Sequence, residues 1–440
     1  MLVIRQARVP AAVLPVGMLE GASLDSLEPW LQVDIEIVDG VFSRIGPSLA
    51  AAPGARVIDA DRRIVLPGLI DAHVHLDKTH TWDRAPNRSA TFAEALSTLA
   101  RDKAHWTEED LFRRASFGLR CAYAHGTRLI RTHVDTGLPW AEVSHAVMAE
   151  LRRQWKGVIA LQTVPLCPGT DWLGPHGPAL ADLALKHGAS ALGGFLLPGP
   201  ELPAQIGRLL ELAEERGVGI DLHVDENGDP AAEVLRAVAT GVLRAEFRRP
   251  VTCGHCCSLA VQAPDRVRST VALVREAGIG VIALPECNLY LQGRRTGGYP
   301  RSPVWRGLTL INDLCDAGVP VACASDNVHD AFHRYGDYDM LQVWALAVRL
   351  GHLDERLSES VEMVTRTPAV LAGRADLGRI EPGLPASLVL LPGRSLGEAL
   401  SRPAAPRSRL DGETLASPEP PAWTEAANGP PAMARVLPPS

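Results

Sequence analysis

The chain has 440 residues and a formal net charge of -7 at pH 7, and its length allows one large domain together with a smaller one. The charge is mild and no dense basic block occurs, which argues against nucleic acid and anionic membrane as partners. The first residues lack the apolar core of a signal peptide, and no apolar run reaches the roughly 20 residues of a membrane span. We therefore expect a cytoplasmic protein, and the sequence leaves open a homo-oligomer.

Both ends of the sequence have the texture of β structure. Short alternating strands broken by turns fill residues 1–65, with Asp39-Gly40 as a hairpin-type turn. The same texture returns at residues 378–393 and 407–417, which predicts that the two ends pair into one small sheet domain. Residues 418–440, rich in Pro and Ala, are expected to form a flexible tail.

Between these ends, apolar strand-like runs alternate with amphipathic helical runs, which is typical of βα units. Eight predicted strands suggest a (β/α)8 barrel, in which chemistry gathers at the C-terminal ends of the strands. The predicted strands are 65–75, 128–135, 158–165, 189–197, 219–225, 251–255, 279–285 and 320–326, and the predicted helices are 108–124, 140–155, 203–216, 231–239, 264–277 and 305–317.

Two histidines end the first of these strands, in the stretch "GLIDAHVHLDK". Because side chains alternate faces along a strand, His73 and His75 point the same way. Both rings can therefore reach one divalent cation. A bare His-x-His is also common as a pair of exposed or hydrogen-bonded histidines, so the metal hypothesis needs partners from elsewhere in the chain.

Three other predicted strands end in side chains of the required types. Each has an ordinary structural alternative: a strand-to-loop junction, a satisfied core histidine or a helix N-cap. Together they would lie on one face of the barrel, which favours a metal site. These side chains are His223, Asp225 and Glu226 after the fifth strand, His255 after the sixth, and Asp326 and Asn327 after the eighth.

The ordered set "HVHLDKT", "RTHVDT", "LQTV", "DLHVDE", "YLQGR" and "SDNVHDAFHRYG" resembles the amidohydrolase superfamily and, within it, the cytosine-deaminase-like enzymes. The resemblance covers nearly the whole chain. It implies an α/β fold: a distorted (β/α)8 TIM barrel over residues 66–373, a small β-sandwich built from residues 1–65 and 374–417, and the tail at 418–440. By the same resemblance, His73, His75, His223 and Asp326 would be the ligands of one divalent metal ion, Glu226 a proton shuttle and His255 a water-orienting group.

Hydrolytic deamination explains these residue types. Water must add to a C=N carbon, and a divalent metal lowers the pKa of bound water from 15.7 toward about 7. Asp326 can accept a proton from that water while Glu226 protonates a ring nitrogen. Zinc and iron(II) both suit neutral histidines with a carboxylate. The fourth strand ends without the lysine that a two-metal site would use, so one ion is expected.

The residues expected to read the substrate depart from the cytosine-deaminase pattern. Pro168 stands where a glutamine would hold the pyrimidine, Asn327 replaces a carboxylate, and Phe332 replaces an indole. The expected partner is therefore a small heterocyclic amine: cytosine, isocytosine, a pterin or an aminotriazine. Further predicted substrate contacts are Gln292, Trp82 and Lys78, with Phe92 as a stacking or core residue.

We predict a metal-dependent deaminase of a planar amino-substituted nitrogen heterocycle, a hydrolase acting on C–N bonds in cyclic amidines. Hydrolysis of a cyclic amide or of an N-alkylamino heterocycle at the same site is the alternative. A metal-binding protein without catalysis would not need Glu226 and His255. A redox pair at Cys253 and Cys256 is disfavoured because the segment predicts a strand end, where buried thiols are expected.

Overall fold

The computed structural model describes residues 1–19, 29–294 and 302–428. Its contacts divide the chain into two compact units. Unit 1 comprises Met1–Asp71, Arg120–Leu129 and Asp339–Pro421, and unit 2 comprises Ala72–Leu119, Ile130–Tyr338 and Ala422–Ser440. The domain ranges inferred from the sequence remain a prediction.

Unit 1 contains two four-stranded sheets. In the first, the predicted hairpin turn is confirmed, because Asp39 and Gly40 lie between two antiparallel strands with φ of 52° and 76°, the region that this turn type requires. The second sheet joins the two ends of the chain, since β5 pairs with β14. The first sheet has the order β3-β2-β1-β4 (Val41–Gly46, Trp30–Val38, Leu2–Pro10, Arg56–Asp59), and the second β16-β15-β14-β5 (Thr414–Ala416, Ser408–Asp411, Ser387–Leu390, Val65–Pro67).

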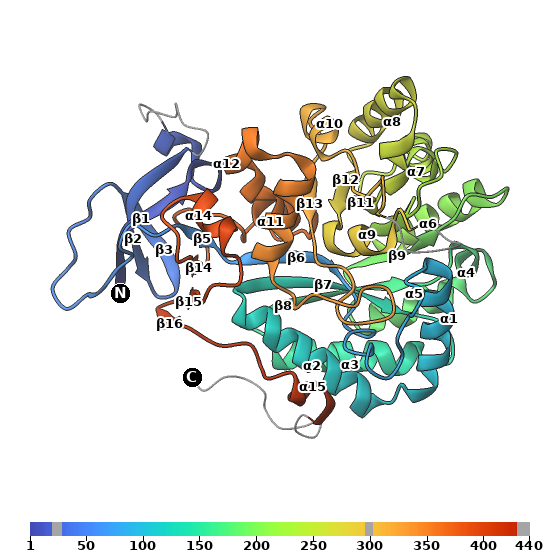
Figure 1. The fold of residues 1–440 in the computed structure, drawn as a ribbon, viewed down its shortest axis with the longest axis horizontal. Helices are drawn as coiled ribbons and strands as arrows, with labels where there is room; N and C mark the ends of the chain where they lie inside the picture. The colour runs from blue at the N-terminus through green and yellow to red at the C-terminus, as the bar shows by residue number, and fades with distance from the viewer. Residues whose placement is uncertain (20–28, 295–301, 429–440) are drawn as a thin grey trace. The chain divides into compact units, whose positions relative to one another are not determined.

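Strands and helices alternate along the chain from residue 69 to residue 323, which gives an α/β fold with parallel sheets (Figure 1). One sheet has the order β13-β12-β11-β10-β9 and another the order β6-β7-β8. Parallel bridges from Val74 to Asp326 and from Pro168 to Phe195 link the edges of the two sheets. The strands are β6 Leu69–Val74, β7 Thr127–Asp135, β8 Ala160–Leu166, β9 Ala191–Leu196, β10 Gly219–Val224, β11 Val251–His255, β12 Gly280–Ala283 and β13 Val321–Cys323.

The helices follow the predicted alternation, and several lie outside the predicted set. The α-helices are α1 Phe92–Asp102, α2 Glu108–Ala124, α3 Ala141–Gln154, α4 Gly169–Leu173, α5 Gly177–Lys186, α6 Leu202–Arg216, α7 Val234–Arg244, α8 Pro264–Glu276, α9 Pro285–Leu291, α10 Ile311–Asp316, α11 Met340–Gly351, α12 Leu357–Ser360, α13 Arg366–Leu371, α14 Leu396–Ser401 and α15 Thr424–Asn428. The 3-10 helices are η1 Ala11–Val13, η2 Val16–Leu19, η3 Lys103–His105, η4 Cys257–Val261, η5 Asp354–Arg356 and η6 Val361–Val364.

Three differences from the predicted elements have local causes. The helix expected at 305–317 begins only at Ile311, because Gly307 has φ of 76° and interrupts helical backbone. α7 begins at Val234, where its first N–H groups donate to the Asp225 carboxylate. Part of the predicted tail is helical, since α15 follows Trp423, whose ring lies 5.9 Å from that of Phe117. Residues 429–440 lie outside the described residues.

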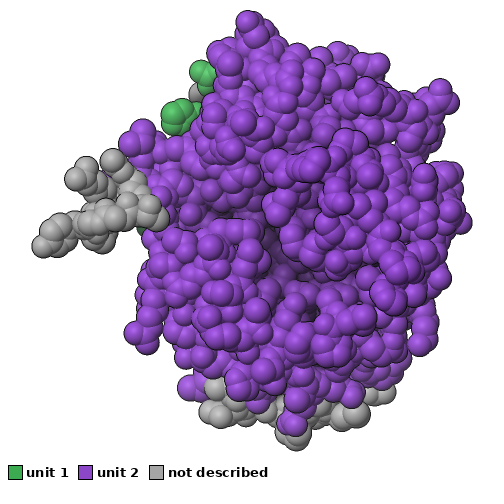
Figure 2. All heavy atoms as spheres, turned by 90° about the vertical axis from the view of Figure 1, so that its right-hand side faces the viewer, with its two compact units in different colours: residues 1–71, 120–129, 339–421 green, residues 72–119, 130–338, 422–440 purple. Residues whose placement is uncertain are grey.

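Among the helices that the structure describes, none combines the length and the apolar character that crossing a membrane requires. Unit 2, seen from the right-hand side of Figure 1, is hollowed near the middle of that face (Figure 2).

Candidate active site

Four candidate metal ligands come together in the interior of unit 2. His73 lies on β6 one residue before its end, His75 follows the strand directly, His223 lies on β10, and Asp326 follows β13. The Nε2 atom of His223 lies 3.0 Å from that of His73 and 3.2 Å from that of His75. Asp326 Oδ1 lies 3.1 Å from His75 Nε2. One donor atom from each residue lies within 4.8 Å of the other three.

The electrostatics of this cluster suit a cation. Burial lowers the pKa of His73, His75 and His223 well below the ordinary value, and neighbouring cationic or imidazole groups lower it further. The rings are therefore neutral, and three nitrogens face a common point together with a carboxylate. Neutral imidazole and carboxylate are ligands of zinc and of iron(II), so the donor set fits one divalent ion.

The backbone at two of the strand ends is strained. His255 and Asp326 have φ of 69° and 63°, the left-handed region that costs about 1–2 kcal/mol for a residue with a side chain. Asp326 N donates to His73 O at 2.9 Å, so the turn after β13 is fixed against β6. Strained backbone of this kind clusters at functional sites.

Glu226 lies beside the cluster with His255 as its neighbour. Glu226 Oε2 lies 3.6 Å from His255 Nε2, and Asn288 Nδ2 donates to His255 Nδ1 at 3.1 Å. This contact leaves the proton of a neutral His255 on Nε2, which faces Glu226. Burial, reinforced by Asp326, raises the pKa of Glu226 well above its ordinary value, against the opposing charge of Lys78. The raised pKa favours the protonated form of Glu226, which is the form that a general acid requires.

A cavity of about 450 Å³ opens onto this group. His75, His223, Glu226 and His255 line it together with the predicted substrate contacts Lys78, Asn327 and Phe332. Phe92 faces Phe332 edge-on, with ring centroids 5.8 Å apart. Asn327 is fixed in orientation, because its Nδ2 donates to Asp330 Oδ2 at 2.6 Å.

Two predicted substrate contacts are not among the residues that line the cavity. Gln292 Nε2 donates to the main-chain oxygen of Glu226 at 3.0 Å, so Gln292 supports the loop that carries Glu226. Trp82 lies under the guanidinium of Arg334, which is 5.2 Å from the centre of its ring.

Sequence reasoning did not single out three charged residues in the cavity: Lys103, Asp135 and Asp171. Lys103 Nζ lies 2.8 Å from Asp135 Oδ1, and burial raises the pKa of Asp171. The composition could have pointed to Lys103. The chain has only four lysines among its 44 basic residues, and two of the four, Lys78 and Lys103, line this cavity. Asn288, which orients His255, carried no such signal.

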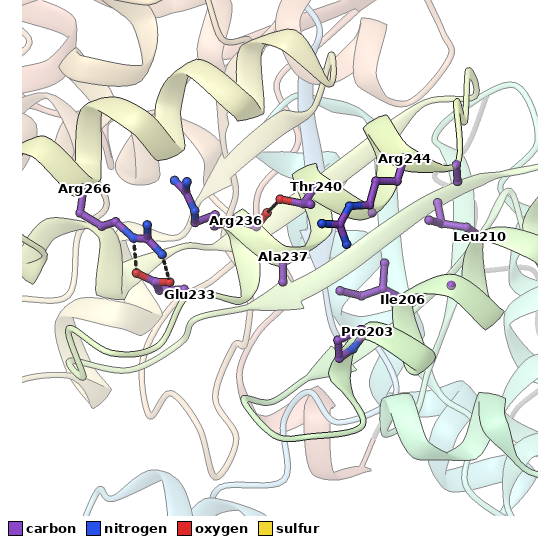
Figure 3. Close-up of a pocket in the computed structure, with 12 residues that line it drawn as sticks. Pro203, Ile206, Leu210, Glu233, Arg236, Ala237, Thr240, Arg244 and Arg266 are labelled. Carbon is purple, nitrogen blue, oxygen red and sulfur yellow. Dashed lines mark hydrogen bonds and ion pairs between the residues drawn. The ribbon is translucent and has the colours of Figure 1, made fainter.

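A second cavity, of about 480 Å³, lies along α6 and α7 and holds none of the candidate residues (Figure 3). Arg266 pairs with Glu233 among its lining residues, and Ile206 and Leu210 line it as well. No histidine lines it, and its one carboxylate, Glu233, is paired with Arg266, so it lacks the group of side chains that the predicted chemistry requires.

The cysteines of "TCGHCC" are buried thiols, as expected. Cys253 and Cys256 are free and fully buried, and burial raises the pKa of both well above the ordinary value. Such thiols are poor nucleophiles and poor redox groups.

Comparison with known proteins agrees with this geometry. The model of an amidohydrolase family matches residues 56–139 and 142–411. A pterin deaminase from Rhizobium rhizogenes is 43% identical over 401 residues, which cover 90% of each chain. An N-isopropylammelide isopropyl amidohydrolase from a Pseudomonas species is 24% identical over 76% of this chain and 81% of its own.

Two solved structures share the fold. The 5-methylcytosine deaminase of Klebsiella pneumoniae liganded with 5-fluorocytosine has a TM-score of 0.81 with 24% identity and covers 95% of this chain and 98% of its own. The N-isopropylammelide isopropylaminohydrolase of Burkholderia multivorans has a TM-score of 0.75 with 26% identity and covers 94% of this chain and 97% of its own.

Proposed function

The chain belongs to the amidohydrolase family, and on that premise we propose that it deaminates a pterin, a 2-amino-4-oxopteridine, by metal-assisted hydrolysis. It is a hydrolase that acts on C–N bonds in cyclic amidines and deaminates a heterocycle. The observation that carries the choice of pterin is the 43% identity, over 90% of both chains, to a pterin deaminase.

The cavity supports a bicyclic substrate. Its volume of about 450 Å³ lies within the range of small-molecule sites, and Phe92 and Phe332 offer aromatic walls to a planar ring. Pro168 lines the cavity and cannot provide the amide that reads a pyrimidine in cytosine deaminase. The polar groups of Lys103, Asp135 and Asp171 remain for the nitrogen atoms of a second ring.

His73, His75, His223 and Asp326 would hold one divalent ion, zinc or iron(II). Three neutral imidazoles and one carboxylate match the needs of such an ion, and their donor atoms converge in a buried site. When bound, the ion supplies a water that is activated at neutral pH.

The remaining steps belong to the protein. Glu226, whose raised pKa favours the protonated form, donates to a ring nitrogen next to the carbon that water attacks, and Asp326 accepts a proton from the water. His255, held by Asn288, orients the attacking oxygen through its Nε2–H. The proton on Asp326 then passes to the departing amine, which leaves as ammonia, and Glu226 recovers a proton from the added hydroxyl as it becomes the carbonyl oxygen, so that one water is consumed. General acid-base catalysis of this kind contributes about 10²–10⁴ in rate.

The architecture inferred from the sequence is part of the same proposal. Bridges at Val74–Asp326 and Pro168–Phe195 between the two parallel sheets support a closed, distorted (β/α)8 barrel over residues 66–373. Bridges between the two terminal sheets, at Arg8–Ile64 and Val41–Pro385, support a β-sandwich built from residues 1–65 and 374–417.

A second candidate reaction is hydrolysis of an N-alkylamino heterocycle, which the likeness to N-isopropylammelide hydrolases favours. Its leaving group would be an alkylamine in place of ammonia.

One experiment separates the two reactions. Pterin, cytosine, isocytosine and N-isopropylammelide are each incubated with the zinc-loaded and the iron-loaded protein, and ammonia and isopropylamine are quantified. We expect the highest kcat/KM for ammonia release from pterin, and its loss in Glu226→Gln. If pterin gave no product while another of these heterocycles did, the choice of pterin as substrate would be wrong.

A further inference from the structure

His133, on β7, is buried beside the proposed metal ligands and has no part in the reaction described above. Its ring centroid lies 4.1 Å from that of His73 and 4.6 Å from that of His223. Neither of its ring nitrogens has a hydrogen-bond partner among the described residues. A buried polar group without a hydrogen-bond partner lowers the stability of the fold. The position of His133 therefore needs an explanation, which its neighbours provide.

Asp221 is the nearest acidic neighbour. It lies two residues before His223 on β10 and is fully buried. Its Oδ2 accepts from Arg131 Nη1 at 2.8 Å, whereas its Oδ1 has no partner among the described residues and lies 3.7 Å from His133 Nε2. One donor atom from each of His73, His133 and Asp221 lies within 4.8 Å of the other two. Asp221 Oδ1 therefore lies next to His133, and His133 in turn lies against His73.

His73 has a nitrogen that the proposed metal site does not use. Its Nε2 faces the other ligands, 3.0 Å from His223 Nε2 and 3.7 Å from Asp326 Oδ1. Its Nδ1 has no partner in the part of the chain that the structure describes. A metal-binding histidine usually donates its second N–H to an acceptor that fixes the tautomer and the orientation of the ring. Nδ1 lies instead near Gly254, since a Cβ added there would be 3.0 Å away, so packing against neighbouring side chains must fix the orientation of the His73 ring.

We propose that His133 and Asp221 are positioning residues for the metal ion, an inference that rests on the ligand set proposed above. His133 fixes the plane of the His73 ring by direct contact. Asp221 Oδ1 faces His133 Nε2 and fixes the orientation of that ring in turn, and Arg131 holds Asp221 in place.

The same three side chains could also be regarded as a second cation site that shares His73. Arg131 argues against it, because its guanidinium already pairs with Asp221 and would repel another divalent ion at this distance. These contacts favour a single metal ion, with the Asp221 carboxylate outside the ligand set.

The test measures zinc affinity in the full-length protein, independently of activity. Metal-stripped wild type, Asp221→Asn, His133→Phe and the double variant compete for zinc with a chromophoric chelator. We expect Asp221→Asn to bind zinc about 10- to 100-fold more weakly. His133→Phe, which keeps a flat ring, should also bind more weakly. The double variant should lose less than the product of the two effects, because the residues act through one chain of contacts.

Asp225→Asn is the matched control. Asp225 is a buried carboxylate just beyond the same strand, and its oxygens accept the N–H groups of Val234 and Leu235 at the start of α7. We expect this variant to unfold at a lower temperature and to bind zinc as the wild type does. The visible spectrum of the cobalt-loaded proteins should change in Asp221→Asn and stay unchanged in Asp225→Asn.

Unchanged zinc affinity in both Asp221→Asn and His133→Phe would overturn the proposal. A second equivalent of tightly bound zinc that disappears in Asp221→Asn would overturn it in favour of a second metal site. If Asp221→Asn does not fold, the affinity and the cobalt spectrum of His133→Phe decide. If His75→Ala kept the full zinc affinity, the proposed ligand set would be wrong. If the variants showed the expected zinc affinities but the wild type released no ammonia from pterin, only the proposed function would be wrong.

Discussion

A Cβ atom added at Gly254 would lie 2.8 Å from Cε1 of the His73 ring. Gly254 is on β11, immediately before His255, and the missing side chain lets the strand approach the first metal-ligand candidate closely. The strand therefore contributes to the site at two successive positions: His255 faces Glu226, and Gly254 leaves room for His73.

Gly254→Ala should displace His73 and weaken zinc binding by at least about tenfold, because a contact this short forces the ring or the strand to move. Competition with a chelator measures the affinity. Gly207→Ala is the control: no atom lies within 4 Å of its added Cβ, and alanine is favoured over glycine in a helix by about 1 kcal/mol. Equal zinc affinity in wild type and Gly254→Ala would contradict this reading of the close approach.

Glu226→Gln should lower kcat on pterin by about 10²–10⁴ with a much smaller change in KM, because the amide keeps the shape of the side chain and cannot donate an acidic proton. Steady-state ammonia release gives both constants, and metal content per chain is measured alongside. A variant that retains near wild-type kcat with full metal content would rule out Glu226 as the general acid.

Lys103→Met should raise KM for pterin and lower kcat/KM roughly tenfold, the effect of one lost hydrogen bond to a charged group. The zinc affinity should not change, since Lys103 pairs with Asp135 in the cavity wall and not with a ligand candidate. Lys156→Met, at an exposed lysine outside the cavity, is the matched control. If both variants keep the wild-type KM, the polar side of the cavity does not read the substrate.

Acid should destabilise the fold partly through His145, a buried residue of α3 whose Nε2 contacts Thr136 Oγ1. Burial lowers its pKa to about 4, whereas the unfolded chain takes up this proton near pH 6.5. The contribution of neutral His145 is thus fully present above pH 6.5 and is lost as the pH falls through 4.

Between these two pH values, the free energy of unfolding of the wild type should fall by about 1.4 kcal/mol per pH unit more than that of His145→Gln. Urea unfolding at pH 7, 6, 5 and 4 measures the difference. Parallel pH profiles for the two proteins would show that His145 does not titrate in this way.

Much of the fold could be predicted from the sequence, because strand and helix periodicity is local. β11 and α2 have the predicted bounds, whereas β5, the first part of the predicted barrel strand 65–75, pairs with β14. The predicted start of the helix at 305–317 was wrong, because the backbone conformation of Gly307 delays the helix to Ile311.

The ligand candidates were predicted, since strand ends in a parallel sheet share one edge, and the structure brings His73, His75, His223 and Asp326 together. Contacts that depend on tertiary packing could not be foreseen. Nothing in the local pattern places Asn288 against His255 or Lys103 beside Asp135. Tertiary packing also decides the contacts of Trp82 and Gln292. Both have side chains suited to substrate binding, but Trp82 contacts Arg334 and Gln292 donates to the main chain of Glu226.

The measurement that tests the account most directly is ammonia release from pterin as metal is removed and restored. The protein is stripped with a chelator, and zinc or iron(II) is added back in steps while release is followed. The account predicts no release from the stripped protein and a rate that rises linearly up to one equivalent of metal per chain. Release that is indifferent to metal content, or no release from pterin with one equivalent bound, would contradict it.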